Sequence, residues 1–415
     1  MQGKDTTIST FHQFFGPVSS EKFRQQVEEM GVDRYAKKLY TIQLIELVAN
    51  AQIEQLRGLR DISYSLSDDK ISEAIALKSI SASQISRKLR ELPTEVLQLL
   101  FNDVKTQAGK EIGFDTVSQE LGRLRLIDST TISLCLSQFL WAKFRKTKGG
   151  IKIHLGLRFF EQGVFPDEVV ITPTKPADKT QMDTLVVEEE DALNVFDRGY
   201  VDYNKFDKYC EKGIRFITRL KGNAIIEVVA ELPVDPDGPI KKHQIVYLGK
   251  EGVNKMKYSL RLAETEDTQG NPVIIITNDF KLTAEEISTI YRYRWQIELF
   301  FKWIKQHLRV KHFYGTSEQA VENQIFIALI TYCLLMLIKL KVGYKGSLLT
   351  IKRLIHTCLC DPFTSFVQKL YRTPQRSSRG RRRIDHEGIY QLTVRQVVAG
   401  ETGLLNYLSY DPVIL

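Results

Sequence analysis

Residues 291–305 read YRYRWQIELFFKWIK, and much of the fold can be worked out from this stretch. Its apolar residues recur at helical spacing on several faces, which predicts a helix packed among hydrophobic neighbours. At about 100° per residue, four polar side chains fall into one narrow stripe. They are Tyr291, Arg294, Glu298 and Lys305. One carboxylate thus lies beside two cations and a phenol, although such a stripe taken alone favours a solvated face with ordinary ion pairs.

The segments before this stretch predict a mixed α/β architecture. Thr283 is a suitable N-cap with acids after it, so we expect one long helix from there toward Val310. Residues 272–277 (PVIIIT) are typical of a buried strand. Residues 222–271 place turn signals between short alternating runs, which indicates an antiparallel β insertion. Residues 123–221 give three strands followed by helix, strand, helix and strand, which is a mixed α/β core.

Two aspartates follow predicted strands in this core. Asp128 comes after LRLI, and Asp197 comes after NVF. Aspartates at such places are commonly turn or cap residues. Together with Glu298 on the late helix they can also converge, and three hard oxygen ligands suit Mg²⁺ or Mn²⁺. Two such ions activate the attacking oxygen and stabilise the leaving oxygen of a phosphodiester, so no side-chain nucleophile is required.

The region before residue 119 is predicted to be helical throughout, with apolar positions at helix spacing. Ser83 is a candidate N-cap for the segment QISRKLREL, which is similar to the last helix of a helix-turn-helix. The apolar run Ile325–Ile338 is shorter than the roughly 20 residues that a membrane-spanning helix needs, and lysines follow it. We interpret it as a buried core helix.

Charge is concentrated rather than spread along the 415 residues, whose net charge is +8. Between Lys341 and Arg383 there are 11 basic residues and one acid. Two further basic clusters, Trp141–Arg158 and Ser288–His312, contain aromatic residues. Clustered cations of this kind indicate a polyanion such as nucleic acid, and the alternative is a solvated surface with a basic tail.

The composition also bears on the compartment and on cofactors. Five scattered cysteines are too few for a disulfide scaffold, and the first residues lack a secretory pattern. We therefore expect a cytoplasmic protein with no membrane partner. The sequence has no GxxxxGK[ST] loop, so we expect no nucleotide cofactor.

The order Asp…Asp…Glu and the pattern Y-(2)-R-(3)-E-(6)-K resemble the DDE transposases of bacterial insertion sequences, in particular the YREK-signature (insertion-sequence-four) family. The β insertion and the helical N-terminal region are also similar to that family. The resemblance implies a ribonuclease-H-like mixed sheet flanked by helices and interrupted by a β-rich insertion. The implied domains are a helical DNA-binding domain at 1–118, the catalytic core at 119–221 and 272–345, the insertion at 222–271 and a basic C-terminal region at 346–415.

The resemblance implies that Asp128, Asp197 and Glu298 hold two divalent ions, Mg²⁺ or Mn²⁺. Water would release a 3′-OH at the element end, and this hydroxyl would form a hairpin that is reopened and joined to target DNA. Tyr291, Arg294 and Lys305 would grip the end and a flipped base. A homodimer would hold the terminal inverted repeats in a synaptic complex, in a bacterial cytoplasm beside the nucleoid.

Further DNA contacts are predicted on charge alone. Each of three cations beside the core is equally well explained as a phosphate contact or as an exposed surface charge: Arg198, Arg219 and Lys221. The basic tail adds Arg381, Arg382 and Arg383. Two alternatives remain open, a ribonuclease-H-like nuclease that cuts without joining and a domesticated, non-catalytic DNA-binding protein.

Overall fold

The chain forms two compact units, each described here by itself. The computed structural model describes residues 8–112, 123–145, 148–160, 163–267 and 270–372. The sheet unit comprises residues 115–134 and 144–301, and the helical unit comprises residues 1–114, 135–143 and 302–415.

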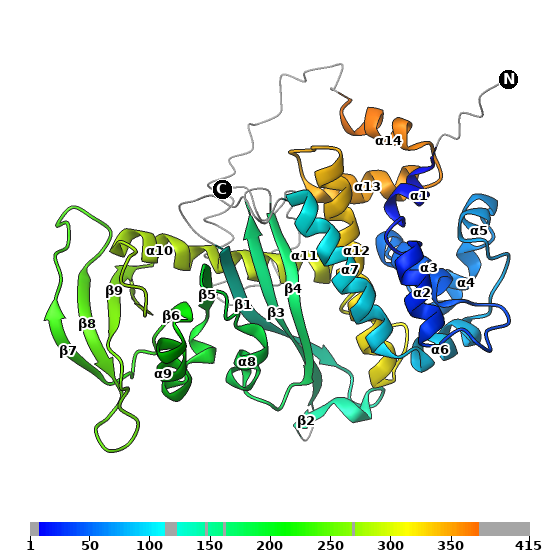
Figure 1. Ribbon diagram of the computed structural model, residues 1–415. Helices are drawn as coiled ribbons and strands as arrows, with labels where there is room; N and C mark the ends of the chain where they lie inside the picture. Colours follow the sequence, from blue (N-terminus) through cyan, green and yellow to red (C-terminus); the bar gives the residue numbers. More distant parts are fainter. Residues whose placement is uncertain (1–7, 113–122, 146–147, 161–162, 268–269, 373–415) are drawn as a thin grey trace. The chain divides into compact units, whose positions relative to one another are not determined.

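One mixed sheet organises the sheet unit (Figure 1). Within the described residues its strand order is β2-β3-β1-β5-β6-β10-β9-β8-β7, and β4 pairs with β3. Strand β1 runs antiparallel to β3 and parallel to β5, and β5 runs parallel to β6. The strands are β1 (Arg123–Leu134), β2 (Lys143–Arg145), β3 (Lys148–Phe160), β4 (Gly163–Pro173), β5 (Ala192–Phe196), β6 (Arg215–Arg219), β7 (Ile226–Glu231), β8 (Lys242–Leu248), β9 (Leu260–Glu266) and β10 (Pro272–Thr277).

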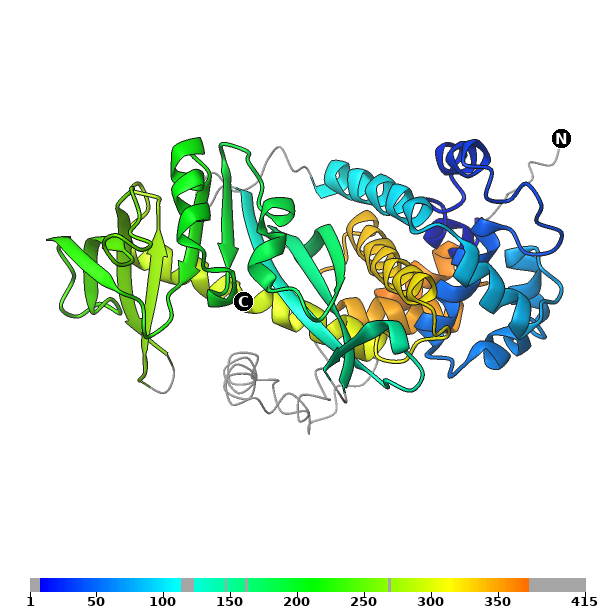
Figure 2. The same cartoon turned by 90° about the horizontal axis from the view of Figure 1, so that it is seen from below.

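Helices lie on both faces of this sheet. Figures 1 and 2 show α9 on one face and α10 on the other. The strands β7, β8 and β9 form an antiparallel meander that continues the sheet beyond β10. The helical segments are η3 (Asp178–Gln181), α8 (Met182–Leu185), η4 (Arg198–Tyr200), α9 (Tyr203–Lys212), α10 (Ala284–Tyr293) and α11 (Trp295–His307), of which α11 continues into the helical unit.

Stacked phenylalanines form the core beneath α9. Phe216 of β6 stacks on Phe206 of α9 with ring centroids 4.7 Å apart and on Phe196 of β5 at 5.9 Å. All three side chains are fully buried. Ile127 of β1 joins the same cluster. Because successive strand residues point to opposite faces, this cluster decides which residues of β1 and β5 face away from α9.

The helical unit packs its helices around α12. Helix α12 is long and apolar enough to cross a membrane. However, 89% of its most apolar stretch is buried inside the protein, which agrees with the predicted core helix. Its helices are α1 (Thr10–Phe14), α2 (Glu21–Glu29), α3 (Thr41–Glu54), α4 (Leu59–Ser65), α5 (Asp69–Ile75), α6 (Ala82–Glu91), α7 (Thr94–Ile112), η2 (Leu140–Ala142), α12 (Glu318–Lys341), α13 (Leu348–Cys358) and α14 (Phe363–Leu370).

Three local expectations differ from the structure. The cap of α6 is Ser81 and not Ser83, because Ser81 and Gln84 form a reciprocal capping box. Asp128 does not end its strand, because β1 continues to Leu134 by pairing with β3. The long helix is interrupted at Arg294, although the Thr283 cap was predicted correctly.

The aromatic stack should dominate the stability of the sheet unit. Phe216→Ala removes a fully buried ring and should cost about 3–5 kcal/mol of unfolding free energy. Phe280→Ala, at a side chain 54% exposed, should change it by less than about 0.5 kcal/mol. Urea unfolding monitored by circular dichroism compares the two, and equal midpoints would contradict this description of the core.

Candidate active site

Two neighbouring strands bring the two aspartates side by side. Ile127 of β1 is paired with Phe196 of β5, and the next residue along each parallel strand is an aspartate. Since Ile127 and Phe196 point into the core beneath α9, Asp128 and Asp197 are directed toward the opposite face. Local alternation and the pairing of β1 with β5 therefore position both carboxylates on the face that carries α10.

The junction of α10 and α11 supplies the third carboxylate and a cation. Nη1 of Arg294 donates to Oδ2 of Asp128 at 3.0 Å and lies 2.9 Å from Oε1 of Glu298. One nitrogen thus contacts oxygens of two acids that are 170 residues apart in the chain. The Arg294 side chain is only 7% exposed, against 16% for Asp128 and 26% for Glu298. The bridge is therefore largely withdrawn from water.

Tyr291 connects the second aspartate to this group. Its hydroxyl lies 3.5 Å from Oδ1 of Asp197, and its ring centroid lies 5.8 Å from the guanidinium carbon of Arg294. The backbone N–H of Arg294 donates to the carbonyl of Tyr291, three residues back, where the helix is interrupted. This tighter turn accompanies the contact between Arg294 and Asp128 on the sheet.

The electrostatics of the site reflect crowded carboxylates in a partly dry environment. The pKa of Asp128 is raised to about 7, chiefly by burial; the charge of Arg294 lowers it, and those of Glu298 and Asp197 add to the rise. Burial alone would lower the pKa of Arg294, but Tyr291 and the three acids hold it above its usual value. Burial also raises the pKa of Tyr291 to about 12. At neutral pH the site thus holds a permanent cation and a carboxyl group near its titration point.

The donor set fits a divalent cation in kind. All three acids offer hard oxygen ligands, and their mutual repulsion disfavours the charged form of Asp128 unless a cation compensates it. In the part of the chain that the structure describes, no three Asp, Glu, His or Cys side chains form a ready-made metal cluster. Arg294 lies between Asp128 and Glu298, so an ion that contacts both would take the place of the guanidinium.

Among the other predicted DNA contacts, Arg219 adjoins the three acids through Tyr291. Arg219 ends β6, and its charge lowers the pKa of Tyr291, which marks it as a neighbour of the site. Arg198, directly after Asp197, and Lys221 are exposed. Lys305 belongs to the helical unit, in the second half of α11. The predicted contacts Arg381, Arg382 and Arg383 lie outside the described residues.

Sequence reasoning overlooked Asp178, which lies on the other side of β1. Its Oδ1 accepts a hydrogen bond from the Ser129 hydroxyl at 2.9 Å and from Nζ of Lys152 at 2.8 Å. Ser129 directly follows Asp128. The available signal was Lys152 beside His154 on one face of a strand, because a lysine largely withdrawn from water needs a counter-charge.

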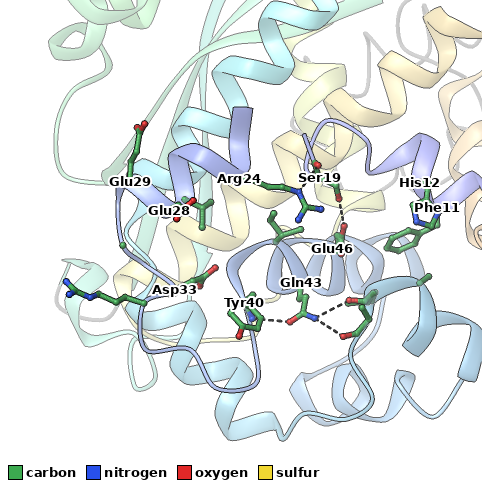
Figure 3. A pocket seen from close by; sticks show the side chains of 17 residues that line it. Phe11, His12, Ser19, Arg24, Glu28, Glu29, Asp33, Tyr40, Gln43 and Glu46 are labelled. Carbon is green, nitrogen blue, oxygen red and sulfur yellow. Dashed lines mark hydrogen bonds between the residues drawn. The ribbon is translucent and has the colours of Figure 1, made fainter. Parts of the chain in front are cut away.

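A separate pocket of about 860 Å³ lies within the helical unit (Figure 3). Its lining comes from residues 11–76 and includes none of the predicted site residues. Glu46 accepts a hydrogen bond from Ser19 there, and burial raises its pKa to about 7. Figure 3 also shows Gln43 accepting from the backbone N–H of Tyr40. We assign no function to this pocket.

Comparison with known proteins identifies the class. A family model described as a transposase DDE domain matches residues 119–334, more than half of the chain. The chain therefore belongs to the DDE transposase family. A second model, for a domain of unknown function, matches residues 6–71.

Two relatives named as transposases agree with this assignment, and one solved structure was also found. The chain is 26% identical over 339 residues to the "Probable transposase for insertion sequence element IS5377" of Geobacillus stearothermophilus, covering 80% of this chain and 85% of the relative. It is 35% identical over 219 residues to "Putative transposase y4zB" of Sinorhizobium fredii, covering 51% and 60%. The cryo-EM structure of a piggyBac transposase synaptic complex with hairpin DNA aligns with a TM-score of 0.44 and 12% identity, over 89% of this chain and 83% of that chain.

We expect the Arg294 bridge to stabilise the folded protein. Arg294→Met leaves Asp128 and Glu298 facing each other without a cation and should cost about 3 kcal/mol in chelator-treated protein. Arg292→Met, at an exposed position two residues earlier, is the matched control and should be nearly neutral. Urea unfolding at pH 8 measures both, and a midpoint for Arg294→Met equal to that of the control would disprove the bridge.

Proposed function

We propose that this DDE transposase binds the terminal inverted repeats of its insertion sequence, cuts them and joins them to target DNA. The observation that carries the proposal is the convergence of Asp128 and Glu298 on one nitrogen of Arg294. Asp197 emerges from the strand beside Asp128 and is linked to Tyr291. A chance surface stripe would not gather three acids from three distant segments on one face of a sheet.

The strand arrangement supports a ribonuclease-H-like core. Three antiparallel strands, β1, β3 and β4, are followed by β5 and β6, which run parallel to β1. The β7–β9 meander occupies the position of the insertion expected from the YREK signature, between Asp197 and Glu298. The position of this meander supports our assignment of the chain to the YREK branch.

In this proposal Asp128, Asp197 and Glu298 hold two Mg²⁺ or Mn²⁺ ions. When bound, such ions activate the attacking oxygen and offset charge on the leaving oxygen. Burial and the neighbouring acids disfavour the charged form of Asp128. Its ionisation is therefore coupled to binding of the cations. A cation that compensated these carboxylates would allow Arg294, which now pairs with both, to bind a DNA phosphate instead.

The proposed reaction begins with hydrolysis. The oxygen of water bonds to phosphorus as the bond from phosphorus to the 3′ oxygen breaks, and this leaves a 3′-hydroxyl and a 5′-phosphate. The 3′-hydroxyl oxygen would then bond to a phosphorus of the opposite strand as that phosphorus loses the 3′ oxygen of the flanking DNA, which takes up a proton; this gives a hairpin on the element end. Water would reopen the hairpin by displacing the 3′ oxygen, and the regenerated 3′-hydroxyl would displace a 3′ oxygen of target DNA to form the joint. Tyr291, a largely buried ring beside Arg294, would contact the DNA end and a flipped base together with Arg294 and Lys305.

Cations around the site fit the phosphate backbone of DNA. Arg219 is close enough to Tyr291 to affect its titration, and Arg198 adjoins Asp197. In the helical unit, burial and the charge of Lys311 lower the pKa of Lys305 to about 8. A phosphate beside Lys305 would relieve both effects and favour its charged form. Synapsis of two ends by a homodimer, in a bacterial cytoplasm beside the nucleoid, completes the proposal.

Glu298→Gln tests the catalytic role of the third carboxylate. The variant keeps the size of the side chain but removes a charged ligand, so Mn²⁺-dependent cleavage should fall by more than about 100-fold. DNA-end binding measured in chelator should stay close to wild type. The substrate is the pair of inverted repeats flanking the protein's own gene, with cut ends mapped by sequencing. Glu285→Gln makes the same change at an exposed position of α10 and should cleave normally.

One result of that experiment and one further assay decide between the alternatives. A Glu298→Gln protein that still cleaves would remove Glu298 from the mechanism. Supplying wild-type protein with a precut 3′-hydroxyl end and target DNA should give joined product. Cleavage without any joining would support the nuclease alternative instead.

A further inference from the structure

A polar cluster supports β1 from the face opposite to the proposed active site. Ser129 and His154 are paired across β1 and β3, and Lys152 lies two residues from His154 on the same side of β3. All three side chains are directed toward Asp178, at the start of η3. The cluster is separate from Arg294, which contacts Asp128 of β1 and pairs with Glu298.

Asp178 is the acceptor that holds this cluster together. It accepts from Ser129 at 2.9 Å and from Lys152 at 2.8 Å, while Nδ1 of His154 lies 3.7 Å away. His154 is fully buried; burial lowers its pKa to about 4, with Asp178 and Lys152 acting in opposite directions. A neutral imidazole leaves Lys152 as the cation that compensates Asp178.

Ser129 connects the cluster to the first aspartate. Its backbone N–H donates to Oδ1 of Asp128 at 2.7 Å, and the other oxygen of Asp128 accepts from Arg294. A continuous chain of hydrogen bonds thus runs from Asp178 through the hydroxyl and backbone of Ser129 to the carboxylate of Asp128. Rotation of the Asp128 carboxylate is restricted by Ser129, whose own side chain is restricted by Asp178.

Both acids act on the buried Tyr200. Burial raises the pKa of its hydroxyl, and the charges of Asp128 and Asp178 act in the same direction. Asp178 also approaches the loop after Asp197, because a Cβ added to Gly199 would lie 3.6 Å from its Oδ2. The cluster therefore adjoins both strands that deliver the proposed aspartates.

We propose that Asp178, acting through Ser129, is a positioning residue that orients Asp128 for binding of the divalent cations. This inference rests on the proposed function, since it assumes that Asp128 is a metal ligand. Residues that orient a ligand from outside the metal's own contacts typically change metal affinity by about 10- to 100-fold. Asp178 itself would not contact DNA or the metal.

The test measures Mn²⁺ binding to the full-length, DNA-free protein by isothermal titration calorimetry. Ser129→Ala and Asp178→Ala should each weaken binding by about 10-fold or more. Ser129→Thr keeps the hydroxyl and should bind like wild type. Asp183→Ala removes another lysine-paired carboxylate, an exposed one that pairs with Lys205, and should also bind like wild type.

Folding and mechanism are separated by the choice of variants. If Asp178→Ala fails to fold, the pair Ser129→Ala and Ser129→Thr decides the question, because both keep Asp178. Wild-type affinity in Ser129→Ala, or equal losses in Ser129→Ala and Ser129→Thr, would overturn the inference. Glu298→Gln is measured alongside: loss of Mn²⁺ binding there with none in Ser129→Ala would refute only the positioning role. Unchanged binding in Glu298→Gln would refute the proposed metal site itself.

Discussion

The guanidinium of Arg294 holds two carboxylates that the chain supplies from a strand and from a later helix. Asp128 and Glu298 would repel each other if both were charged and close, and burial strengthens that repulsion. Arg294 compensates them without a bound ion, at the cost of placing a guanidinium that is 7% exposed at the junction of α10 and α11. The proposed chemistry depends on exchanging this internal cation for divalent ions.

Successive residues of one strand contribute alternately to the hydrophobic core and to the proposed site. Ile127 and Phe196 pack beneath α9, whereas the aspartates that follow them are directed toward the face carrying α10. Ser129, one step further along β1, points back to the first face and meets Asp178. A one-residue shift in the pairing of β1 would exchange these roles, so the register of the core determines whether the site exists.

Much of the site could be predicted from the sequence because its signals are local. The helical stripe containing Tyr291, Arg294 and Glu298 follows from the geometry of one helix, and the strand before Asp197 follows from a short apolar run. The continuation of β1 past Asp128 could not be predicted in this way. It depends on pairing with β3, which begins more than ten residues further along the chain.

Two other features are equally non-local. The interruption of the helix at Arg294 accompanies contacts with a strand 166 residues away. Asp178 lies in a segment where nothing distinguishes it from other acids until the fold brings Ser129 and Lys152 to it. The sequence therefore predicts the candidate ligands, whereas the contacts that Arg294 and Asp178 make with them are visible only in the structure.

Crystals of the protein with a DNA end and Mn²⁺, measured at the manganese absorption edge, test the central claim most directly. The account predicts anomalous peaks coordinated by oxygens of Asp128, Asp197 and Glu298, with Arg294 no longer bridging two of them. Manganese bound elsewhere, with the Arg294 bridge intact, would contradict it.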